Sequence, residues 1–80
     1  MQPTSIKKLI KSKSIQDLKE AEEKICQNER PNFEVEGDNE KEQLTHILAA
    51  IHILEMAEND KIGLNIAFRR FFERVRTSIS

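Results

Sequence analysis

The sequence contains no Trp and no Tyr, a single Cys, and only two Gly and two Pro among 80 residues. With one thiol, Cys26, no disulfide framework can form within the chain. With glycine only at Gly37 and Gly63, the glycine-rich loop that binds nucleotide phosphates is excluded. With Phe as the only residue of the Phe, Tyr and Trp class, the hydrogen-bonding aromatic side chains of Tyr and Trp are absent.

The chain also lacks a long apolar run. Its longest uncharged stretch, from Gln43 to Leu54, is too short to cross a bilayer, which takes about 20 apolar residues. The first ten residues contain Lys7 and Lys8 and lead into no long apolar run, so we expect no signal peptide. We therefore expect a cytoplasmic protein without membrane contact.

The formal net charge is only −1, which gives no general attraction to nucleic acid or anionic lipid. The charges are nevertheless sorted along the chain. Residues 34–60 carry eight acidic side chains against Lys41, and residues 61–80 carry five basic ones against Glu73. The first thirteen residues add four lysines and no acid. We therefore expect the function of the protein to depend on its charged surfaces.

The stretch from Leu44 to Ala57 organises the expected fold. Its apolar residues at helical spacing form one stripe, made of Leu44, Ile47, Leu48, Ile51 and Leu54. Further apolar residues, among them Ile53 and Met56, cover much of the opposite side. A helix that is apolar nearly all round is normally buried, so we expect the central helix of a small bundle.

Periodicity and capping residues predict three more helices. Thr4 or Ser5 is expected to cap the first, and Ser14 with Asp17 forms the capping-box pattern of the second. Asn39, three residues before Glu42, is expected to cap the central helix. The four helices are predicted at about 4–12, 15–27, 39–58 and 62–78.

Residues 33–37 alternate apolar and acidic side chains, a strand pattern in a chain that offers no second strand. The segment is either an extended cover, with Phe33 and Val35 facing the bundle, or a strand that pairs with its own copy. We favour the cover, because isolated two-stranded pairing is marginal. The predicted fold is a single all-α domain over residues 1–80, with the central and last helices forming an antiparallel hairpin.

The residues that could carry chemistry do not form a recognisable site. His46 and His52 are six positions apart and point to different faces of a helix, whereas helical metal sites need a spacing of three or four. Cys26 ends a helix, where the dipole does not activate a thiol. We therefore predict no catalytic residue, metal site or cofactor, and no enzymatic activity.

Three segments together resemble a family of short, uncharacterised bacterial proteins. They are Ile6-Lys-Lys-Leu9, the helix start from Glu42 to His52, and the closing segment from Phe68 to Ile79. The resemblance implies a compact helical protein that ends in a basic amphipathic helix. It carries no activity and no catalytic residue.

We expect a protein-interaction or regulatory module that acts as a homodimer. The short chain gains from extra burial, and two-fold dimers are the commonest oligomers. The predicted partner surface consists of Ile53, Met56, Phe72, Arg69, Arg70, Arg74 and Arg76. The alternative is contact with nucleic acid through the four arginines, which the acidic middle of the chain disfavours.

Overall fold

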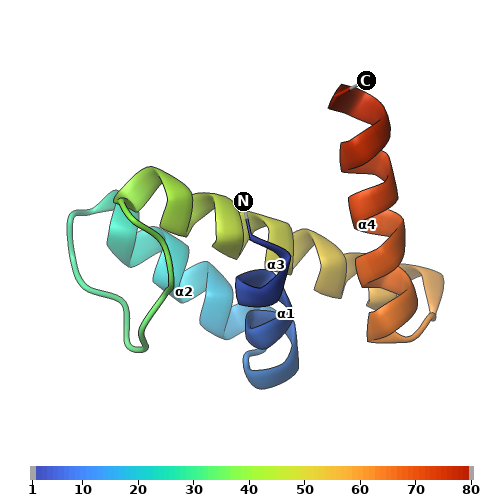
Figure 1. Ribbon diagram of the computed structural model, residues 1–80. Helices are drawn as coiled ribbons and strands as arrows, with labels where there is room; N and C mark the ends of the chain where they lie inside the picture. The colour runs from blue at the N-terminus through green and yellow to red at the C-terminus, as the bar shows by residue number, and fades with distance from the viewer. Residues whose placement is uncertain (1, 80) are drawn as a thin grey trace.

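The computed structural model describes residues 2–79, with side chains through residue 75, and builds four helices from them. They are α1 (Pro3–Ser12), α2 (Ile15–Cys26), α3 (Glu40–Asp60) and α4 (Leu64–Ile79). No strand occurs within the described residues. Helix α3 packs against each of the other three, as Figure 1 shows. The predicted all-α bundle around a central helix is confirmed.

Two of the predicted helix caps are confirmed. The Ser14 side chain accepts a hydrogen bond from the backbone N–H of Asp17, and the Asp17 carboxylate accepts one from the backbone N–H of Ser14, both at 3.2 Å. Asn39 accepts from the backbone N–H of Glu42 at 2.9 Å. These contacts satisfy helix-end N–H groups that have no partner within the helix.

The predicted cap of the first helix is wrong. Helix α1 begins at Pro3, Gln2 occupies the cap position, and Gln2 makes no side-chain capping bond. Proline favours the first helical position because it has no N–H to satisfy and its φ angle is already helical. Ser5 therefore lies inside the helix, and its hydroxyl is free to bond elsewhere.

The core lies between α3 and the two N-terminal helices. Ile6 of α1, Leu18 of α2, and Ile47 and Ile53 of α3 are fully buried. Helix α4 contributes Ala67, which is also fully buried, while Phe68, Phe71 and Phe72 pack against the core from partly buried positions. Burial on several sides explains why α3 is apolar nearly all round.

The loop from α2 to α3 covers the bundle, as favoured from the sequence. Val35 is buried and Phe33 is partly buried against the core. The Lys13 ammonium lies 4.5 Å from the centroid of the Phe33 ring. At Gly37, φ is +150° and a Cβ would lie 2.9 Å from Gln43, so glycine is needed where the chain turns into α3.

Helices α3 and α4, which were predicted to form an antiparallel hairpin, pack against each other and are joined through Lys61, which ends α3 in the left-handed conformation. Figure 1 shows that α4 rises steeply from the C-terminal part of α3, so the two helices cross rather than run alongside each other over their full lengths. The second half of α4 projects from the body. None of the helices in the described part of the chain has the length and apolar content needed to span a membrane.

Candidate functional site

Two residues of the predicted partner surface lie in the core instead. Ile53 has no exposed surface and Met56 is 8% exposed. Both belong to the core cluster that α3 forms with its neighbouring helices. Their placement on an exposed surface is wrong because neighbours surround α3 on more than one side. These side chains are not available to a partner.

The rest of the predicted surface lies on α4 and is divided over its sides. Phe72 is half-buried, with its ring centroid 4.8 Å from that of Phe68. Arg69, Arg70 and Arg74 are exposed, and Arg70 lies 3.9 Å from Asp60. The side chain of Arg76 falls outside the described residues. The structure therefore brings Phe72 and Arg69 together, and separates them from Arg70.

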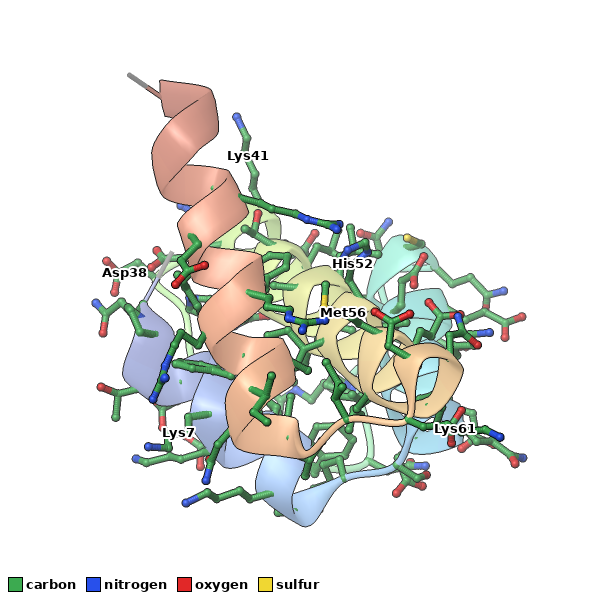
Figure 2. All side chains as sticks on the ribbon, turned by 90° about the vertical axis from the view of Figure 1, so that its right-hand side faces the viewer. Lys7, Asp38, Lys41, His52, Met56 and Lys61 are labelled. Carbon is green, nitrogen blue, oxygen red and sulfur yellow. The ribbon has the colours of Figure 1, made fainter. Side chains whose placement is uncertain are left out.

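A crevice of about 530 Å³ separates α1 from α4. Its lining combines two half-buried phenylalanines with exposed polar and charged side chains: Lys7, Asn65, Phe68, Arg69, Phe72 and Glu73. The Lys7 ammonium lies 5.9 Å from the centroid of the Phe68 ring. In Figure 2, Lys7 lies on one side of α4 and His52 on the other.

The other side of α4 faces the exposed surface of α3. The rings of His52 and Phe71 are 5.5 Å apart. Leu48 lies one turn before His52 on α3, and Val75 lies one turn after Phe71 on α4, so the apolar surface continues along both helices. Leu48 is 50% exposed. We call Leu48, His52, Phe71 and Val75 the α3–α4 corner.

A third feature, which the sequence did not reveal, is a hydrogen-bonded cluster around the buried His46. The backbone N–H of Gln2 donates to His46 Nε2 at 3.0 Å. Nδ1 therefore carries the ring proton and donates it to the backbone carbonyl of Glu36 at 2.8 Å. His46 is 1% exposed, so the neutral ring joins the start of α1, the loop and α3.

Ser5 and Glu36 complete this cluster. The Ser5 hydroxyl donates to one carboxylate oxygen of Glu36 at 2.7 Å, and the Lys8 ammonium donates to the other at 3.1 Å. Serine, histidine and glutamate are the residue types of a hydrolytic triad, but a triad needs the serine hydroxyl on the imidazole. Here both imidazole nitrogens are bonded to backbone groups. The hydrogen bonds of the cluster hold the start of α1, the loop and α3 together, and they do not activate Ser5.

The other residues with possible chemistry lie apart. Cys26 is an exposed free thiol at the end of α2, and His52 is exposed on α3. Among the residues that the structure describes, no group of three or more His, Cys, Asp or Glu side chains could hold a metal ion. The candidate binding surfaces among the described residues are therefore those on either side of α4.

Glu36 makes the fold sensitive to acid. Its hydrogen bonds with Ser5 and Lys8, together with the Lys8 charge, hold the pKa of the carboxyl below its ordinary value of 4.5. A carboxylate with a lowered pKa stabilises the folded state above its unfolded pKa, and this contribution is lost as pH falls through the folded value. We expect Glu36→Gln to be less stable than the parent at pH 7, with the difference shrinking below pH 4.5.

Urea unfolding of both proteins between pH 7 and pH 3 measures this difference. Glu34→Gln is the matched control, since Glu34 is exposed on the same loop. A stability difference between Glu36→Gln and the parent that stays constant down to pH 3 would contradict the assignment.

A family model described as "Family of unknown function (DUF6952)" matches residues 1–80. No curated protein and no solved structure matches the chain. The family match confirms the resemblance to an uncharacterised family and adds no residue roles to those described above.

Proposed function

The chain belongs to this family of unknown function, and we propose that it is a non-enzymatic protein-interaction module that acts as a homodimer. The surface proposed for self-association is the α3–α4 corner. A partner there would bury the apolar groups that the single chain leaves half covered.

Leu48 is the observation that carries this proposal. It is 50% exposed although it belongs to the apolar stretch of α3, and it lies one turn before His52, whose ring contacts the half-buried Phe71. Large apolar groups gathered on an exposed surface are typical of interaction sites. In a two-fold dimer, α4 of each copy would lie in the corner of the other, so both copies of Leu48 would be buried.

The charges beside the corner suit such a pairing. Glu55 continues the exposed side of α3 past His52, and Arg70 and Arg74 are exposed on one side of Phe71 on α4. A two-fold axis through the corner can bring arginines of one copy to Glu55 of the other. Exposed pairs of this kind contribute about 0–1 kcal/mol each, so they orient the dimer, while the apolar contact supplies its stability.

Leu48→Asp is expected to dissociate the dimer without unfolding the chain. A charge at the centre of an interface costs roughly 2 kcal/mol or more, and the two-fold axis applies this cost twice. The control is Ile66→Asp, because Ile66 is equally large and 48% exposed on another side of α4. Sedimentation equilibrium at micromolar concentration should show a dimer for the parent and the control. A parent sedimenting as a single 9.3 kDa species overturns the dimer.

Nucleic acid is the weaker alternative. On a helix, Arg70 and Arg74 share one side of α4, while Arg69 lies in the crevice on another side. Arg70 also lies beside Asp60, and Glu73 lines the crevice beside Arg69. Phosphates of a backbone need several cations on one face, which this distribution does not supply.

A further inference from the structure

The crevice between α1 and α4 points to a second binding surface, and we propose that it docks an acidic peptide segment of a partner protein. Such a segment would carry a large apolar side chain between carboxylates. The inference rests on the proposed function only in treating the chain as an interaction module. It does not need the dimer, because the crevice and the α3–α4 corner lie on different sides of α4.

Both ends of the chain are rich in basic residues, and each end contributes one cation to this crevice. The first thirteen residues, which include α1, carry four lysines and no acid. Residues 61–80, which include α4, carry five basic side chains and one acid, whereas residues 14–60 carry thirteen acids and four basic side chains. The fold brings one cation of each segment, Lys7 and Arg69, to the same crevice, where the Lys7 ammonium lies 5.9 Å from the centroid of the Phe68 ring. An acidic partner is therefore attracted to this end of the molecule.

The cations in the crevice are not held in salt bridges with described side chains. Among the described side chains, neither Lys7 nor Arg69 has a salt-bridge partner. By contrast, Lys8 is bonded to Glu36, and Arg70 lies beside Asp60. Lys7 and Arg69 come from different helices that line the same crevice, so they can each take a carboxylate flanking one apolar residue.

The two phenylalanines at the floor of the crevice are the reason to expect a large apolar side chain in the partner segment. Phe68 and Phe72 are half-buried and tilted against each other at 49°, so part of each ring remains uncovered between the cations. Asn65 lies one turn before Phe68 and Arg69, where its amide can bond a peptide backbone. Lys7, Asn65, Arg69 and Glu73 are all exposed, so the crevice is too open to enclose a small ligand. An extended or helical peptide gains further contacts by lying along α1 and α4.

Single-stranded nucleic acid fits less well. Base stacking needs accessible aromatic faces, and Phe72 packs against Phe68 at 4.8 Å and edge-on against Phe71 at 5.2 Å. A protein segment is therefore the occupant that the lining favours.

The test uses the full chain and a labelled synthetic peptide of fifteen residues, with leucine at helical spacing and glutamate at the other positions. Fluorescence anisotropy should show saturable binding that weakens as salt rises. Lys7→Glu combined with Arg69→Glu should weaken it about tenfold, because each change replaces an attraction by a repulsion. The control, Lys19→Glu with Arg30→Glu, makes the same change of net charge at exposed positions elsewhere and should leave binding unchanged.

Three results would overturn the proposal. They are the absence of saturable peptide binding, equal weakening by the two double variants, and tighter binding of a thymidine oligonucleotide that the Lys7 and Arg69 changes abolish. The same titration on Leu48→Asp separates this proposal from the dimer. Peptide binding retained by a monomeric chain supports the crevice whether or not the parent self-associates.

Discussion

Ile53→Asp should remove most or all of the folding stability, whatever the protein concentration. Ile53 has no exposed surface, so the aspartate would place an unpaired charge in the core. Removing one partner of a buried ion pair costs about 3–5 kcal/mol, and a charge that never had a partner is penalised at least as strongly. A protein of this size has roughly 4–12 kcal/mol of stability in total. Circular dichroism should show loss of the helical signal and of cooperative thermal unfolding.

Leu48→Asp is the matched control for this experiment. It makes the same chemical change on the same helix, five positions earlier, at a side chain that is half exposed. It should keep the helical spectrum and a cooperative transition. If Ile53→Asp were folded and monomeric, Ile53 would have to lie at an interface between copies. That result would contradict the burial of Ile53 in the core.

The contrast between Leu48 and Ile53 shows what the sequence could not decide. Periodicity places both on an apolar α3, and it predicted the helix to within two residues at its C-terminal end. It does not say where neighbouring helices lie. Three helices pack against α3, and they cover Ile53 and Met56 while leaving Leu48 half exposed. For a helix that is apolar nearly all round, the exposed side is set by tertiary packing.

Local signals were reliable where a single turn decides the structure. The Ser14 capping box and the Asn39 cap involve residues three apart, and both formed as predicted. The cap of α1 was misplaced because Pro3 competes for the helix start. The crevice joins Lys7 to Phe68 and the cluster joins Gln2 to His46, contacts between residues far apart in the chain. No periodicity in one helix encodes them.

His46→Leu should be the second most damaging change. Leucine fills a similar space but bonds neither the Gln2 N–H nor the Glu36 carbonyl, which His46 joins at 3.0 and 2.8 Å. Gln2 and Glu36 are exposed residues, so water can reach part of the freed backbone groups, and we expect a loss of roughly 1–3 kcal/mol in all. For a domain of this size, that lowers the melting temperature by roughly 5 to 20 °C. Urea and thermal unfolding measure both quantities.

Two variants separate lost hydrogen bonds from lost packing. His46→Asn keeps a donor near the position of Nδ1 and should recover part of the loss, because an asparagine amide can still bond the Glu36 carbonyl. His52→Leu removes the exposed histidine, which contacts the Phe71 ring, and should change stability little. If His46→Leu and His52→Leu were equally stable, the ring of His46 would not be fastening the loop and α1 to α3. If His46→Asn were the less stable of the two His46 variants, packing would outweigh the hydrogen bonds in that cluster.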